Sequence, residues 1–274
     1  MIFIVLSTIL FGLLDSLWGP TINKFGHFDT LFHRTIISVT ILIIFFVIVS
    51  EFTWDFLMIL LSILSGIIAF FGVYTITKAF SISGTISIVV LNVVTILVGQ
   101  LFSLLFFKSE IILPVYTLQI LFSILIIALL NNFSLNINKG IKLGLVSSLC
   151  FGFSYPLLGI PIKVLGNVQS TMIQEFSVFL CIILWGLSQN KLQFKKEIIL
   201  KKEILFLGLI TSICLLLYFY SYTLLPVYKV NLISNFYPVS AMIFSYFIFK
   251  ERITKIQFIG VVLSLLLLIH LSLF

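Results

Sequence analysis

An acidic residue, Asp15, lies inside the otherwise apolar segment FGLLDSLWGP near the start of the chain. Trp18 follows on the same helical face, small residues flank both, and Pro20 comes soon after. An ionisable side chain in hydrocarbon is costly, so it is expected to face a cavity or a partner. A carboxyl group shielded from water can also carry a proton near neutral pH. Asp15 is therefore predicted to line a cavity and carry protons, or else to pair with a neighbouring helix.

Two further ionisable residues occupy matching places in the two halves of the chain. Glu175 lies several residues inside an apolar segment, and Arg34 lies 141 positions earlier, at the start of another. Arg34 is near enough to the expected helix end for its guanidinium to reach the interface. Glu175 is deeper and is the second candidate for proton coupling, whereas Arg34 is a candidate for binding only.

Tyrosines and amides are concentrated in the segment LLLYFYSYTLLPVYKVNLISNFYPVSAM. Tyr218 and Tyr222 share one helical face, and so do Asn231 and Asn235. An amide stripe on a membrane helix either joins helices by hydrogen bonds or lines a wet cavity, and the adjacent tyrosines favour the cavity. The full set of predicted substrate-binding residues is Asp15, Trp18, Arg34, Asn92, Tyr155, Glu175, Tyr218, Tyr222, Asn231, Asn235 and Tyr237.

The composition decides what positions these side chains. Of 274 residues, 61% are hydrophobic and 9% are charged, whereas a soluble domain is about 25% charged. Soluble enzyme classes are thereby excluded. Apolar runs long enough to cross a bilayer as helices lie at 2–22, 32–49, 56–78, 84–107, 112–130, 141–162, 170–188, 204–224, 228–249 and 255–273. The predicted fold is an all-α integral membrane protein with ten transmembrane helices.

One register relates the two halves of the chain. Gly12 and Gly152 are 140 residues apart, and Gly66 and Gly208 are 142 apart. We therefore expect a first five-helix repeat at 1–131, a linker at 132–140 and a second repeat at 141–274. Because five is odd, two such bundles enter the membrane in opposite senses, which gives an inverted repeat.

The sequence favours no cofactor and no metal. Its three cysteines, Cys150, Cys181 and Cys214, are scattered through apolar runs without metal-site spacing. No nucleotide-binding loop or hydrolase motif occurs, so neither ATP-driven pumping nor an enzyme is expected. The net charge of +7 lies mostly in loops, which fits anionic lipid headgroups rather than nucleic acid.

The C-terminal segment resembles a known family. Pro238, Glu251, Gln257 and Gly260 resemble the repeat ending of EamA-type transporters of the drug/metabolite transporter (DMT) superfamily. A weaker version contains Glu110 and Gln119, and the pattern of Gly12, Trp18, Gly19 and Arg34 is also similar. The resemblance implies two inverted five-helix bundles, a cavity lined by the first four helices of each, peripheral fifth and tenth helices, and secondary transport of metabolites.

The predicted function is secondary-active transport of a small polar metabolite, an amino acid or related compound, by alternating access and in the direction of efflux. Protons are the candidate coupling ion, and the expected location is the cell membrane. A lipid-carrier flippase of the same fold and a non-transporting assembly subunit remain alternatives. The basic loops place both termini outside, while the family resemblance suggests the reverse.

Overall fold

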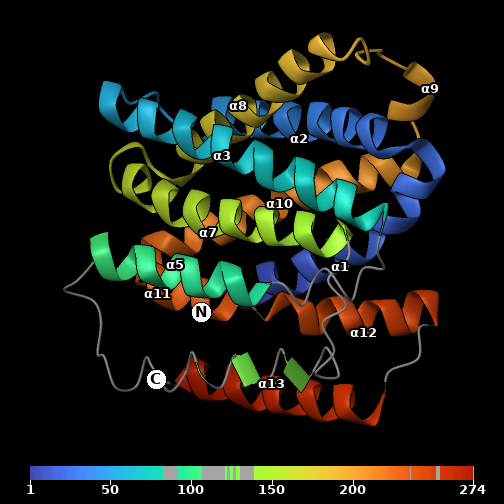
Figure 1. Ribbon diagram of the computed structural model, residues 1–274. Coiled ribbons are helices and arrows are strands. Elements are labelled where there is room, and N and C mark those ends of the chain that lie inside the picture. The colour runs from blue at the N-terminus through green and yellow to red at the C-terminus, as the bar shows by residue number, and fades with distance from the viewer. Residues whose placement is uncertain are drawn as a thin grey trace.

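The computed structural model describes residues 1–82, 92–106, 139–234, 236–250 and 254–273, together with five single positions between 121 and 129. Within these residues the secondary structure is helical and no β-strand occurs. The helices are α1 (Ile2–Phe25), α2 (His27–Val49), α3 (Phe56–Phe80), α5 (Asn92–Phe106), α7 (Lys139–Leu165), α8 (Asn167–Ser188), α9 (Lys196–Ile199), α10 (Lys202–Leu224), α11 (Val227–Ser234), α12 (Tyr237–Phe249) and α13 (Lys255–Leu273) (Figure 1).

Six described helices, α1, α2, α3, α7, α8 and α10, are long and apolar enough to cross a membrane. The prediction of an all-α membrane protein is confirmed. The number of ten transmembrane helices stays a prediction, because the expected span at 112–130 falls almost entirely outside the described residues.

The ninth expected span, 228–249, is not one continuous helix. Among the described residues, α11 ends at Ser234 and α12 begins at Tyr237. Pro238 is in the first turn of α12 and has no N–H to donate to the carbonyl of Ser234, so the helix does not continue through it. Broken helices in transporters place their free ends near the membrane midplane.

Helices α2 and α8 lie side by side and run in opposite directions. Gly186, near the end of α8, faces Phe28 at the start of α2, while Gln169 at the start of α8 bonds Thr53 beyond the end of α2. The turns before these helices therefore lie at opposite ends of the bundle. Each turn contains a glycine with positive φ, 87° at Gly26 and 79° at Gly166, where other residues would be strained. We name the two ends of the bundle the Gly26 end and the Gly166 end.

Close helix approaches occur at two glycines that the repeat register relates. A Cβ added at Gly12 of α1 would lie 2.5 Å from the backbone nitrogen of Ala241 in α12. A Cβ added at Gly152 of α7 would lie 2.7 Å from the Cβ of Val98 in α5. Helix α1 thus contacts α12, and α7 contacts α5.

The second pair of glycines behaves in the same way. A Cβ at Gly66 of α3 would lie 2.5 Å from the carbonyl oxygen of Gln174 in α8, and one at Gly208 of α10 would lie 3.0 Å from that of Arg34 in α2. The register that relates the two halves of the chain places Gly66 on Gly208 and Arg34 next to Gln174, so the two contacts correspond to each other. The two inverted repeats and their boundaries remain a prediction, with which these matched contacts agree.

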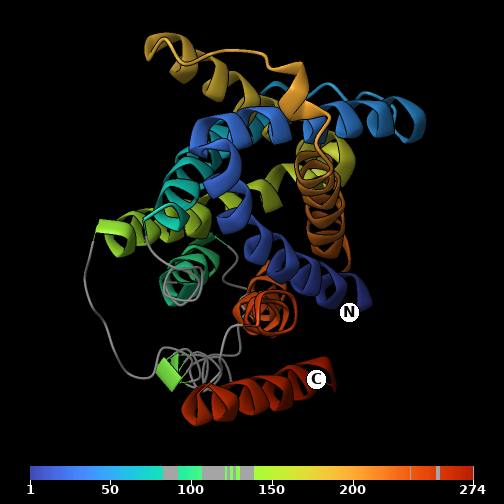
Figure 2. The same cartoon turned by 90° about the vertical axis from the view of Figure 1, so that its right-hand side faces the viewer.

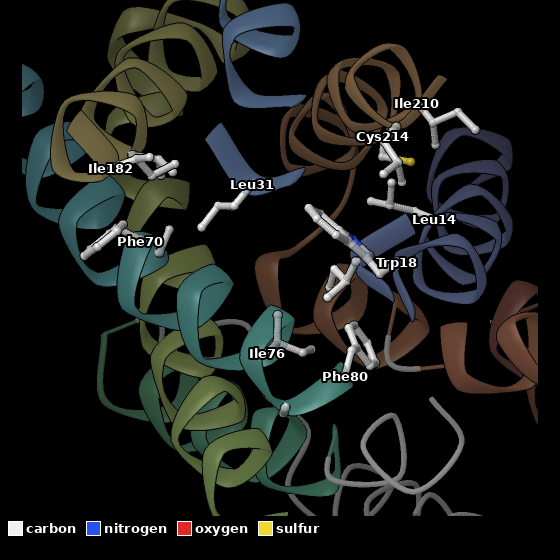
Figure 3. Close-up of a cluster of buried hydrophobic side chains, with 14 of the residues drawn as sticks. Leu14, Trp18, Leu31, Phe70, Ile76, Phe80, Ile182, Ile210 and Cys214 are labelled. Atoms are coloured by element: carbon white, nitrogen blue, oxygen red, sulfur yellow. The ribbon is translucent and has the colours of Figure 1, made fainter. Parts of the chain in front are cut away.

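A buried apolar cluster holds the helices around the centre of the bundle. It joins Leu14 and Trp18 of α1 to Ile210 and Cys214 of α10, and it extends to α2, α3 and α8 (Figure 3). By contrast, both views place α13 at the edge of the bundle, below α12 and far from α2 and α8 (Figures 1 and 2). The central helices are therefore the ones that can surround a site.

Candidate substrate cavity

A cavity of about 110 Å³ lies among the helices of the bundle. Of the described helices, nine contribute to its wall: α1, α2, α3, α5, α7, α8, α10, α11 and α12. A buried water molecule needs about 10–15 Å³ of such volume, so the cavity has room for several waters or a small solute. Its wall contains these predicted binding residues: Asp15, Trp18, Arg34, Tyr155, Glu175, Tyr218, Asn231 and Tyr237.

Three predicted residues are not among the described residues of this wall. Tyr222 is 4% exposed and does not line the cavity, but it is hydrogen-bonded to Tyr218 and Asn231, which do. The side chain of Asn92 and the whole of Asn235 lie outside the described residues. Their assignment to the site remains a prediction.

Arg34 and Glu175 form a buried ion pair across the interface of α2 and α8. Arg34 Nη1 lies 2.8 Å from Glu175 Oε1, and the two side chains are only 2% and 7% exposed. Ser38, one turn after Arg34, donates a second hydrogen bond of 2.6 Å to the same carboxylate oxygen. The guanidinium also lies 5.4 Å from the ring centre of Trp18. The charges of Arg34 and Glu175 thus compensate one another.

The position of Arg34 differs from the sequence expectation. Helix α2 begins at His27 rather than at residue 32, so Arg34 lies two turns inside the helix and is buried instead of reaching the interface. Polar residues in that first stretch, among them Asp29 and His33, are satisfied by contacts with other segments. Hydropathy therefore placed the helix start too late.

Asp15 has a different environment from Glu175. Its side chain lines the cavity and the residue is 8% exposed, yet its Oδ2 is buried with no hydrogen-bond partner among the described residues. No ion pair with Asp15 occurs in the described part of the chain. A buried carboxylate without a partner is stable only if it carries a proton or meets a cation. Asp15 is therefore the charged group of the wall that remains available to a ligand.

Tyr218, Tyr222 and Asn231 form a hydrogen-bonded triad on the α10 and α11 side. The Tyr218 hydroxyl donates to Asn231 Oδ1 at 2.7 Å, and the Tyr222 hydroxyl donates to the same oxygen at 2.6 Å. The two hydroxyls lie 2.9 Å apart. This arrangement fixes α11 against α10 beside the break that precedes α12, and it presents Tyr218 and Asn231 to the cavity.

Aromatic rings continue around the wall from this triad. Tyr155 lies 5.2 Å from both Tyr218 and Phe151, and Phe11 lies 6.0 Å from Tyr218 and 6.3 Å from Tyr237, measured between ring centres. All five rings line the cavity. The wall is consequently aromatic over a continuous stretch that starts one turn before Asp15.

Several residues of the cavity wall were not predicted from the sequence. Gln174, beside Glu175, donates from Nε2 to the hydroxyls of Ser65 at 2.9 Å and Ser154 at 3.2 Å and joins α8 to α3 and α7. An amide inside an apolar run was a usable indication for Gln174. Phe11 and Phe151 gave none, because one phenylalanine among thirty looks like any other.

The helices that hold the ion pair are tied down at both ends. At the Gly166 end, Gln169 bonds the backbone N–H and carbonyl of Thr53 at 2.9 and 2.7 Å. At the Gly26 end, the N–H of Lys195 donates to His33 Nε2 at 2.9 Å, and the Lys195 ammonium lies 2.6 Å from Asp29. These ties fix how α2 and α8 present Arg34 and Glu175 to each other.

Comparisons with known proteins agree with this architecture. The chain shares its fold with a protein of known crystal structure, with a TM-score of 0.70 and 12% identity over 98% of this chain and 93% of that chain. That likeness concerns the fold alone. No significant match was found among curated protein sequences.

The family assignment comes from the second half of the chain. Residues 138–273 match the sequence profile of the EamA-like transporter family, a part of the DMT superfamily. Such a match indicates a multi-pass membrane protein that acts on a small-molecule substrate. Through residues 138–273, the chain belongs to the EamA-like transporter family.

Proposed function

We propose that this membrane transporter exports a small polar metabolite from the cell by alternating access across the cell membrane. The observation that carries the proposal is the cavity, which places Asp15, Tyr155 and Asn231 within a bundle that contains helices long enough to span a bilayer. Polar side chains inside a membrane normally serve a substrate or ion pathway, because their burial is otherwise costly. Small metabolites that carry an amino group are the candidate class, with amino acids and related amines among them.

Two other functions are less well supported. A lipid-carrier flippase would need a lateral opening for an acyl chain, whereas the polar side chains in the described wall, Asp15, Tyr155 and Asn231, suit a small polar solute. An assembly subunit would need neither a cavity nor a buried Asp15 carboxyl whose Oδ2 has no partner among the described residues. The cavity thus favours a solute over a lipid or a protein partner.

The test is solute counterflow in proteoliposomes that contain the purified full chain. Vesicles are loaded with a pooled metabolite mixture, and exchange against labelled external solutes is followed with empty liposomes as the control. We expect at least one small polar solute to exchange, while fluorescent lipids flip no faster than in empty liposomes. Lipid flipping without solute exchange would replace this proposal by the flippase.

Proton coupling is proposed for Asp15 rather than for Glu175. Glu175 already accepts hydrogen bonds from Arg34 and Ser38, whereas Asp15 lines the cavity with Oδ2 unpartnered among the described residues. We therefore expect Asp15→Asn to abolish accumulation driven by a pH gradient. Glu51→Gln removes the same charge from an exposed loop and should behave as the unaltered protein. Unchanged pH-driven accumulation in Asp15→Asn would remove Asp15 from coupling.

A further inference from the structure

The charges in the cavity wall are unequal. Among the described residues that line it, the ionisable side chains other than tyrosines are Asp15, Arg34 and Glu175. One is basic and two are acidic, so the ionised wall carries one net negative charge. The sequence alone suggested a zwitterion, because it shows both signs of charge without showing which charges are already paired.

The basic group is not available to a carboxylate ligand. Arg34 donates to Glu175 at 2.8 Å and faces the ring of Trp18. Its Nε is buried and has no hydrogen-bond partner among the described residues. A ligand carboxylate would have to displace Glu175 from Arg34, which would leave a second buried carboxylate uncompensated. Anions and zwitterions are therefore disfavoured.

The acidic group that remains is accompanied by rings. Phe11 lies one turn from Asp15 on α1, and its ring contacts those of Tyr218 and Tyr237. Aromatic faces attract alkylammonium and quaternary ammonium groups, and the attraction grows where water is excluded. The hydroxyl of Tyr218 already donates to Asn231, so Tyr218 contributes mainly its ring to this side of the wall.

The helix break near the cavity leaves this balance unchanged. Ser234 at the C-terminal end of α11 and Tyr237 at the N-terminal end of α12 both line the wall. The two helix termini carry opposite partial charges of about half an elementary charge each, so their contributions offset one another at that place. The Asp15 carboxylate therefore remains the main uncompensated charge of the described wall.

We infer that the transported substrates are organic monocations, amines or quaternary ammonium compounds with an apolar body and no carboxylate, whose positive group binds at Asp15 against Phe11 and the tyrosine rings. This inference rests on the proposed transport function.

The test compares three probes of similar size on the purified full chain at fixed pH: benzyltrimethylammonium, zwitterionic phenylalanine and 3-phenylpropionate. We expect the dissociation constant of benzyltrimethylammonium to be lower than the other two by about tenfold or more. Because this ranking is measured on the unaltered protein, it does not depend on how any variant folds. Equal or tighter binding of phenylalanine or 3-phenylpropionate, or no binding of benzyltrimethylammonium, would overturn the inference.

Two variants then locate the cation. Asp15→Asn should weaken benzyltrimethylammonium binding about tenfold or more, whereas the exposed Glu51→Gln should leave it unchanged. Equal binding by Asp15→Asn and the unaltered protein would contradict the assignment to Asp15. The same three probes, used in counterflow, distinguish a failure of the inference from a failure of the transport proposal. Exchange of anions or zwitterions without exchange of the cation defeats only the inference, while exchange of no solute at all defeats the transport proposal.

Discussion

At the scale of single residues, the two buried acidic side chains near the cavity have opposite roles. Glu175 shares its charge with Arg34 and accepts a bond from Ser38, so it contributes structure. Asp15 has no such compensation in the described part of the chain, so it can respond to a proton or a ligand. The difference comes from their neighbours and not from residue type.

The Arg34–Glu175 pair gives a prediction about stability. Arg34→Gln or Glu175→Gln alone should each lower the free energy of unfolding by about 3–5 kcal/mol, because each leaves an uncompensated buried charge. The double variant should lose much less than the sum of the single losses. Thermal or denaturant unfolding in detergent, arranged as a double-mutant cycle, measures this coupling.

The matched control is the Lys24–Glu203 pair, whose side chains are 55% and 29% exposed at a separation of 2.6 Å. Removing either partner there should cost about 0–1 kcal/mol, since water screens the pair. Additive losses for Arg34 and Glu175 would contradict their pairing.

At the scale of elements, glycines decide how closely the helices pack. Gly66 lets α3 contact the backbone of α8, and Gly208 lets α10 contact α2. These contacts bring α2 and α8 to the centre, where Arg34 and Glu175 meet. The close approaches are therefore part of how the cavity wall is assembled.

Substitution of these glycines tests the packing. Gly66→Ala should lower the free energy of unfolding by about 1–3 kcal/mol, because its Cβ would lie 2.5 Å from the carbonyl oxygen of Gln174. Gly99→Ala is the control, since a Cβ there would meet nothing nearer than 3.6 Å. Thermal unfolding in detergent compares the two variants, and an equal loss at both positions would refute the packing argument.

At the scale of the whole molecule, positive charge is concentrated at one end of the bundle. The loop that contains Lys191, Lys195 and Lys196 is tied to α2 at the Gly26 end through Asp29, and Lys24 lies there as well. Lys163 lies at the opposite end, close to Gly166. Basic residues favour the cytoplasmic side of a membrane.

We therefore predict that the Gly26 end faces the cytoplasm. In a background with the three native cysteines replaced, an impermeant maleimide should label Glu51→Cys in intact cells, because that loop lies at the Gly166 end. Lys191→Cys should be labelled only after the membrane is permeabilised. The reverse labelling pattern would support the orientation that the family resemblance suggests.

Much of the candidate site could be predicted from the sequence, for a clear physical reason. Polar side chains such as Asp15, Glu175 and Asn231 stand out inside apolar runs. Burying such a side chain in the bilayer costs free energy, so those that occur there normally have a partner or a function. Apolar wall residues such as Phe11 and Phe151 could not be predicted. Lipid contact, core packing and a ligand pocket all accept the same side chain.

The sequence by itself determined the membrane environment, the helical class and the short set of residues from which a site could be built, because hydropathy and the cost of buried charge act locally along the chain. It also related Arg34 to Glu175 by register without establishing that they touch. Only the tertiary structure decided that these two residues neutralise each other and that Asp15 remains available. Pairing depends on which distant segments are brought within about 3 Å, and a local sequence pattern carries no such distance.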